Sequence, residues 1–215
     1  MNKLAQCAPL EGGGTEMGDS DLNHKVYEFA HSQKGQFVGA GRECWDLADS
    51  ALTYAGAQSS TTTGKNDDYV WGAETGTHQV RAGDILQFRN YETKITTTTR
   101  VTFDDGEWSE KTQVNTTKRP HHTAIVATYN PSSVVVLEQN YPEGSRVVES
   151  TIPLSSISPT TKTTMKTMKD SSGKSRPATV SVTTTVEVKG QLKAYRPQPK
   201  TDTKPKTDAK PKAKK

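Results

Sequence analysis

The sequence predicts an α+β fold in which two helices precede an antiparallel β-sheet. Three observations support this class. Apolar residues recur at helical spacing between residues 20 and 56, they alternate with polar residues from residue 84 onward, and turn sequences separate the alternating segments. Only 31% of the chain is hydrophobic and 24% is charged, so we expect a modest core with long exposed segments.

Two amphipathic helices are expected near the N-terminus. In the first, apolar residues recur at helical spacing between residues 22 and 30, and Gly35 is suited to end the helix. The second begins near Glu43, ends at Gly56, and carries one apolar stripe made of Cys44, Leu47, Ala48, Ala51, Leu52 and Ala55. Cys44 therefore falls in the first turn of this helix.

Period-two alternation predicts the strands of the sheet. A turn at residues 130–133 should join two of them into a hairpin, and a short strand should close the domain before Pro197. The expected strands cover residues 84–88, 122–128, 134–139, 147–152 and 190–196.

Two threonine-rich excursions interrupt this plan. Residues 92–118 turn at Asp104-Asp105-Gly106, and residues 160–189 turn around Ser171-Ser172-Gly173. Their weak apolar alternation is typical of ribbons that project from a sheet, so we expect two long exposed β-hairpin insertions.

The ends of the chain should be disordered. Residues 1–18 are small, polar and glycine-rich, and residues 198–215 repeat lysine, proline and threonine, which cannot bury enough surface to offset the entropy of ordering. The expected folded domain is residues 19–197.

Charge and hydropathy limit the partners of this domain. Seven lysines and two aspartates give residues 200–215 a charge of +5, and the whole chain carries +4, so residues 1–199 sum to −1. A nearly neutral domain argues against specific nucleic-acid binding. No signal peptide and no apolar run of about 20 residues is present, so we expect a cytoplasmic protein with no membrane span.

The order of polar residues along these elements points to chemistry. Cys44 opens a helix, His122 opens a strand, and residues 138–140 close the next strand. A thiol attacks a carbonyl carbon as a thiolate, which a helix N-terminus and a neighbouring imidazolium both stabilise. The imidazole in turn needs an acceptor for its second nitrogen, and an amide or carboxylate at the end of the adjacent strand can supply one.

Asn140 is the first choice for that acceptor and Glu138 is the second. If residues 122–128 and 134–140 form a hairpin in which residue 128 faces residue 134, then residue 122 lies opposite residue 140. Side chains alternate along a strand, so Glu138 and Asn140 share a face and the residue between them points to the other.

These elements resemble a known superfamily, the papain-like cysteine peptidases and amidases, and within it the CHAP-type amidohydrolase domains. The chain most closely resembles the cysteine-proteinase-fold domain of fungal actin-patch, myosin-interacting proteins. The resemblance covers residues 22–195 apart from the two hairpins. It is carried by residues 39–48 (GAGRECWDLA), 69–72 (YVWG), 82–88 (AGDILQF), 122–126 (HTAIV) and 137–140 (LEQN).

The resemblance implies a papain-like cysteine-proteinase fold and a cysteine hydrolase, either a peptidase or an amidase. It implies a nucleophile at Cys44, a general base at His122 in preference to His121, and an orienting group at Asn140 or Glu138. The substrate would be a peptide or another amide-containing molecule. The absence of an export signal argues against peptidoglycan.

Simpler interpretations of the same residues stay open. A cysteine in an apolar helical stripe is often only a small buried hydrophobe. Trp45, Tyr69 and Trp71 would bind substrate if they line a cleft, but aromatics near a helix start more often only pack. The fold could also serve as a catalytically silent interaction module that binds a protein partner through its hairpins or tail. No spacing suggests a metal site, and we expect no cofactor.

Overall fold

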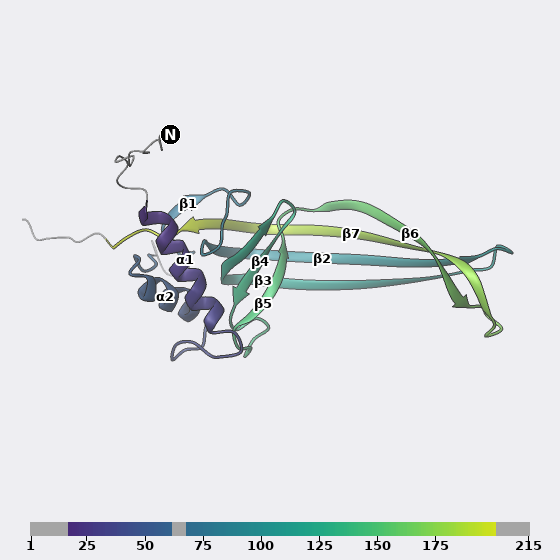
Figure 1. Cartoon of the computed structure of the whole chain (residues 1–215), viewed down its shortest axis with the longest axis horizontal. Coiled ribbons are helices and arrows are strands. Elements are labelled where there is room, and N and C mark those ends of the chain that lie inside the picture. Colours follow the sequence, from purple (N-terminus) through teal and green to yellow (C-terminus); the bar gives the residue numbers. More distant parts are fainter. Residues whose placement is uncertain (1–16, 62–67, 201–215) are drawn as a thin grey trace, which may run out of the picture.

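The computed structural model describes residues 17–61 and 68–200, and it confirms the α+β class. Two helices and one seven-stranded antiparallel sheet make up the described part of the chain (Figure 1). The elements are α1 (Met17–Ser32), α2 (Cys44–Ala55), β1 (Ala73–Thr75), β2 (Ile85–Phe103), β3 (Trp108–Asn130), β4 (Ser133–Glu138), β5 (Val148–Pro153), β6 (Ile157–Lys169) and β7 (Ser175–Arg196).

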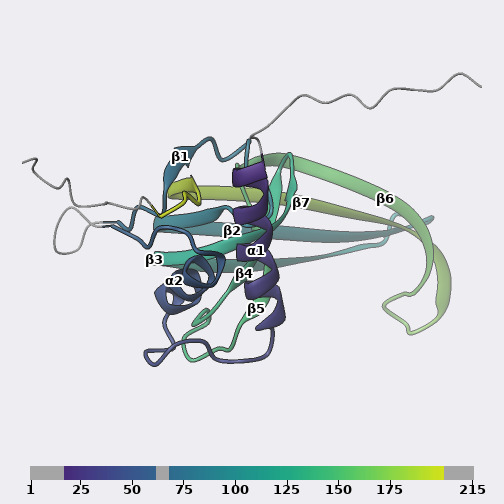
Figure 2. The same ribbon diagram turned by 60° about the vertical axis from the view of Figure 1, so that its left-hand side comes forward.

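The two helices pack on each other and on one face of the sheet (Figure 2). Their apolar stripes meet because residues three and four apart lie on the same side of a helix. Leu22, Val26 and Ala30 of α1 join the buried residues of α2 and, from the sheet, Ile125 and Leu137. This cluster is the main core, and it holds α2 against β3 and the end of β4.

The sheet has the strand order β1-β7-β2-β3-β4-β5, and β6 pairs with β7 outside this path. Strand alternation divides the buried residues between its two faces. Ile85 and Ile125 face the helices, whereas Leu86, Phe88 and Val126 join a second apolar cluster. Phe88 lies opposite His122 in the β2–β3 register, which sets His122 beside a buried aromatic ring.

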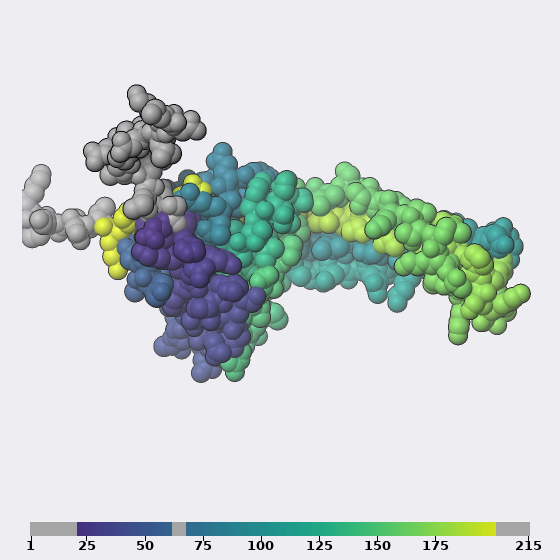
Figure 3. Space-filling model, in the orientation of Figure 1, coloured from purple at the N-terminus to yellow at the C-terminus, as the bar shows by residue number. Residues whose placement is uncertain are grey.

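The threonine-rich segments continue the core strands. Residues 92–118 are the outer parts of β2 and β3 with their turn, and the second segment forms β6 with the outer part of β7. Both segments form hairpins around the expected turns, but they prolong strands of the sheet and do not interrupt them. Together the four strands form an arm that extends well beyond the helices (Figure 3).

A backbone irregularity marks the base of the arm. The β2–β7 register shifts between Arg89 and Glu92, and Asn90 has a left-handed φ of 49°. On β7, Gly190 has a φ of 89°, and a Cβ there would lie 2.1 Å from the carbonyl oxygen of Asn90. Only glycine allows the two backbones to come this close, so Gly190 is required where the arm leaves the domain.

The outer end of the arm is held by Arg176. Its guanidinium forms ion pairs with Asp104, with Asp105 at 2.9 Å and with Asp170 at 3.5 Å, and it lies over the ring of Phe103. Phe103 also belongs to a small buried cluster with Val101, Ala178 and Val180. The two turns at the tip are thus tied to each other.

The expected disordered segments, residues 1–18 and 198–215, lie mostly outside the described residues. Where the structure does describe them, helix α1 already begins at Met17, and Pro199 forms a β-bridge with Ala57. Neither described helix has the length and apolar character needed to cross a membrane.

Candidate active site

Cys44 is the first residue of α2, and its side chain is half-buried. The preceding residue, Glu43, is extended with φ −86° and ψ 165°, and its backbone N–H donates to the carboxylate of Asp46 at 2.9 Å. This contact satisfies one of the backbone groups that a helix start leaves without a partner. Cys44 therefore sits at the positive end of the helix dipole.

Gln139 fixes the loop that leads into α2. Its side-chain amide donates to the carbonyl oxygens of Val38 and Glu43 at 3.0 and 2.9 Å, and its oxygen accepts from the N–H of Val38 at 2.7 Å. The side chain is fully buried. These three bonds join the end of β4 to the residue before the thiol, and so they set the distance between the helix start and the sheet.

His122 lies between the thiol and a carboxylate. Its Nε2 is 2.9 Å from Oε2 of Glu138, and the Cys44 thiol is near enough to the ring to raise the pKa of His122. Because Glu138 occupies Nε2, Nδ1 is the ring nitrogen that remains to face the thiol. Burial alone would lower the pKa of His122. The interactions with Cys44 and Glu138 have a larger effect, so the pKa lies above its usual value.

Glu138 is fully buried, yet it is held in the charged form. Arg119 grips its carboxylate with two hydrogen bonds, from Nη2 at 2.8 Å and from Nε at 3.1 Å. Burial alone would raise the pKa of Glu138, but the hydrogen bonds from His122 and Arg119 lower it to about 2. Glu138 is therefore an anion at neutral pH, and His122 faces a permanent negative charge.

Arg119 is a residue of the site that the sequence pattern missed. It is 4% exposed, and its guanidinium lies 3.8 Å from the ring centroid of Tyr141 and 5.7 Å from that of Phe88. A single arginine at the edge of a threonine-rich stretch looks like a surface residue. The sequence signal that could have revealed its role is its position on the same strand as His122, three residues before it.

The structure brings Glu138, and not the first-choice Asn140, to within hydrogen-bonding distance of His122. Pairs on β3 and β4 near the site, such as Ile125 with Leu137, have the expected register, but β4 ends at Glu138. Asn140 then has a left-handed φ of 60°, so the backbone leaves the extended conformation of the strand at this residue. Its amide nitrogen donates to Oε2 of Glu43 and its oxygen accepts from the N–H of Gly144, both at 2.6 Å.

His121 belongs to a different group, as alternation predicts. It is 3.6 Å from the carboxylate of Asp68, which also pairs with Arg89 at 2.7 Å, and its ring lies against Tyr69. Partial burial and the nearby Arg89 lower the pKa of His121. The pKa values of the two neighbouring histidines therefore shift in opposite directions. Only His122 lies near both the thiol and the carboxylate of Glu138.

The three aromatic candidates form one cluster, but they differ in exposure. Trp71 is fully buried and donates from Nε1 to Gln87, so it packs beneath the other two and does not reach a substrate. Trp45 and Tyr69 are half-buried, with ring centroids 6.4 Å apart. Trp45 follows the thiol directly and is tied to Ser60 by a bond of 2.9 Å. Both side chains are therefore partly open to solvent, unlike Trp71.

Chemically, the arrangement brings together a thiol, an imidazole and a fixed carboxylate. The N–H of Cys44, at the start of α2, is a donor available for a developing oxyanion. Among residues 17–61 and 68–200, no cluster of three or more histidine, cysteine, aspartate or glutamate side chains could hold a metal ion.

Comparisons with known proteins place the chain in a family. The family model described as the AIM3/BBC1 cysteine proteinase-fold domain matches residues 16–207. The protein named Altered inheritance of mitochondria protein 3 from Debaryomyces hansenii is 30% identical over 129 residues, which cover 54% of this chain. The match spans only 12% of that relative's length. No solved structure matches.

Proposed function

Because the chain belongs to the AIM3/BBC1 cysteine proteinase-fold domain family, we propose that it is a cysteine hydrolase that cleaves an amide bond. Cys44 is the nucleophile, His122 is the general base and acid, and Glu138 orients His122. The observation that supports this most strongly is that His122 is hydrogen-bonded to an ionised Glu138 and has its pKa raised by the neighbouring Cys44.

In the proposed first step, the proton of the Cys44 thiol passes to Nδ1 of His122. The sulfur electron pair then attacks the amide carbonyl carbon, and the carbonyl π electrons move to oxygen. The Cys44 N–H at the start of α2 stabilises the oxyanion. As the intermediate collapses, the C–N bond breaks, and His122 gives its proton to the departing amine.

The second half of the reaction releases the acyl group. Water attacks the thioester carbonyl while Nδ1 of His122 takes a proton from it. The carboxylic acid leaves when the C–S bond breaks and the thiol is restored. Through both halves Glu138 keeps Nε2 protonated and fixes the ring plane, and Arg119 keeps Glu138 in place.

Two features suit a peptide or another extended amide as the substrate. The thiol is half-buried and so is open to solvent, and Trp45 and Tyr69 are partly exposed beside it. Cys44 is a free thiol, which fits a cytoplasmic setting where thiols stay reduced. The proposed reaction needs no metal or cofactor, because the chain supplies the nucleophile, the base and an oxyanion donor.

The second candidate is a catalytically silent module that binds a protein. It is favoured by one observation, namely that the arm made of β6 and the outer parts of β2, β3 and β7 supplies none of the site residues. Fold and site would then serve only as a scaffold for the arm.

A trapping experiment separates the two candidates. A cysteine-directed acyl probe should form a thioester that peptide mass spectrometry locates on Cys44 and that hydroxylamine releases. Cys44→Ser should abolish the adduct, and the matched variant Cys7→Ser should keep it. Adduct formation on Cys7 alone, or none on either thiol, would contradict the hydrolase and favour the binding module.

A further inference from the structure

The hairpin of β6 and β7 differs in charge from the rest of the arm. Residues 157–186 hold five basic side chains and one acidic one, a net charge of +4, whereas residues 92–118 hold four basic and five acidic ones, a net charge of −1. The single acidic residue, Asp170, is paired with Arg176. Lys162, Lys166 and Lys169 of β6 are exposed, and none forms an ion pair within the described residues.

Strand β6 also has a free edge. It pairs with β7 along one side, and no strand in the described part of the chain pairs with its other side. Alternate residues along β6 therefore present backbone N–H and C=O groups to solvent. Figure 2 shows β6 bending away from β2 and β3, which leaves this edge accessible.

A hollow of about 440 Å³ lies over one face of this hairpin. Lys162, Thr164 and Lys166 are on the same face because side chains alternate along a strand. Val182 lies opposite Lys162 in the β6–β7 register and forms part of the floor. The hollow is lined by Thr160, Thr161, Lys162, Thr164, Lys166, Val182 and Thr184.

Met165 gives the other face an apolar contact point. It is 69% exposed, and its sulfur accepts from the hydroxyl of Thr179 at 3.2 Å. A strand added along β6 would thus meet Lys162 and Lys166 on one face, and Met165 among threonines and Lys169 on the other.

We propose that the free edge of β6 binds an extended acidic peptide segment, which adds to the sheet as a further strand. Its backbone pairs with β6, and its carboxylates lie over Lys162 and Lys166. Lysines on an open edge repel a second copy of the same edge, while they attract a strand of opposite charge.

The chemistry of the hairpin favours a peptide over other polyanions. Residues 157–186 contain no aromatic side chain on which a nucleic-acid base could stack. Only a polypeptide backbone can satisfy the row of N–H and C=O groups along the edge. The inference does not depend on catalysis at Cys44, because no residue of the thiol site lies on this hairpin.

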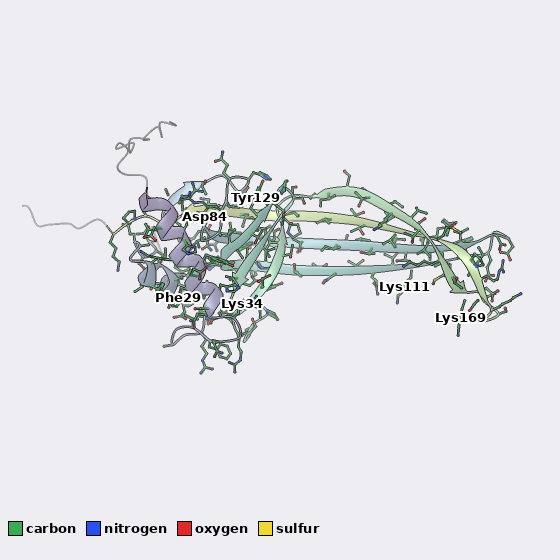
Figure 4. The ribbon with its side chains drawn as sticks, viewed as in Figure 1. Phe29, Lys34, Asp84, Lys111, Tyr129 and Lys169 are labelled. Carbon is green, nitrogen blue, oxygen red and sulfur yellow. The ribbon has the colours of Figure 1, made fainter. Side chains whose placement is uncertain are left out.

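The test uses the full chain carrying Cys44→Ser and a fluorescent peptide of about ten residues that alternates glutamate with valine. Fluorescence anisotropy should show saturable binding that weakens as salt is raised. Lys162→Glu/Lys166→Glu should weaken it at least about tenfold, because attraction becomes repulsion at both positions. Lys111→Glu, an exposed lysine on β3, should leave it unchanged (Figure 4).

A second peptide distinguishes strand addition from charge attraction. It keeps the glutamates but replaces two valines with proline, which cannot pair as a strand, and it should bind far more weakly. Equal affinity for both peptides would overturn the proposal. Equal affinity of the native and Lys162→Glu/Lys166→Glu chains would also overturn it. Both chains keep the basic residues 200–215, so equal affinity would place the attraction there and not on β6. Tighter lysine-dependent binding to single-stranded DNA or to anionic lipid vesicles would also overturn it.

Discussion

Replacing Glu138 with glutamine tests the electrostatics of the site most sharply. The change keeps the shape of the side chain but removes the charge that pairs with both Arg119 and His122. Arg119 would then be a buried cation without a counterion. Breaking one partner of such a pair costs about 3–5 kcal/mol of folding free energy. We therefore expect Glu138→Gln to be destabilised by that order.

The pH dependence follows from the pKa of Glu138, which is lowered from 4.5 to about 2. A carboxylate with a lowered folded-state pKa adds stability above its unfolded-state pKa, and this stability is lost as the pH falls toward the folded value. The shift corresponds to about 3 kcal/mol at ~1.4 kcal/mol per pKa unit. The native protein should lose roughly this amount through this group on acidification, and Glu138→Gln should not.

Urea unfolding from neutral pH down to about pH 2 measures both effects. The difference in unfolding free energy between the two proteins should be largest near neutral pH and should shrink on acidification. Arg119→Met/Glu138→Gln provides the control, because it removes both charges and should be more stable than Glu138→Gln alone. A difference that stays constant with pH, or a double variant that is less stable than Glu138→Gln, would refute the reasoning.

Three further predictions concern residues outside this pair. Gln139→Leu removes three hydrogen bonds to the loop before Cys44. It should lower the free energy of unfolding in urea by about 2 kcal/mol and slow the alkylation of Cys44. An unchanged unfolding free energy together with an unchanged alkylation rate would contradict this role of Gln139. Gly190→Ala should lower the melting temperature more than Gly173→Ala. Both glycines have positive φ, but only at residue 190 would a Cβ lie against a backbone oxygen. Equal losses of melting temperature would contradict this account of the arm's base. Arg176→Gln should speed amide hydrogen exchange in both tip turns and leave the helices unaffected, and an unchanged tip would show that Arg176 does not tie the turns together.

Periodicity was enough to predict the helices and the order of the core strands. The apolar stripe of α2 and the alternation in residues 122–128 are local signals, and the structure has the expected elements at both places. The continuity of β2 through residue 103 could not be predicted, because alternating threonines look the same in an insertion and in an extension of a core strand. Only the pairing with β3 and β7 distinguishes the two.

The site was predictable to the extent that it depends on sequence order. Cys44 lies near enough to His122 to raise the pKa of its imidazole, and its catalytic role stays a prediction. Asn140 was misplaced because the hairpin argument assumed that β4 continues to residue 140, and a left-handed residue ends this alignment. Arg119 and Gln139 were missed for a different reason. Their burial results from the packing of loops and strands, and neither residue type is usually buried.

The contact between Cys44 and His122 is the central claim, and comparative thiol alkylation tests it most directly. With iodoacetamide near neutral pH, Cys44 should react faster than Cys7 in the same chain, because His122 accepts the proton from the Cys44 thiol. His122→Ala should remove the advantage of Cys44, whereas His121→Ala should preserve it. Equal rates at the two thiols in the native protein, or an advantage of Cys44 that survives His122→Ala, would contradict the account.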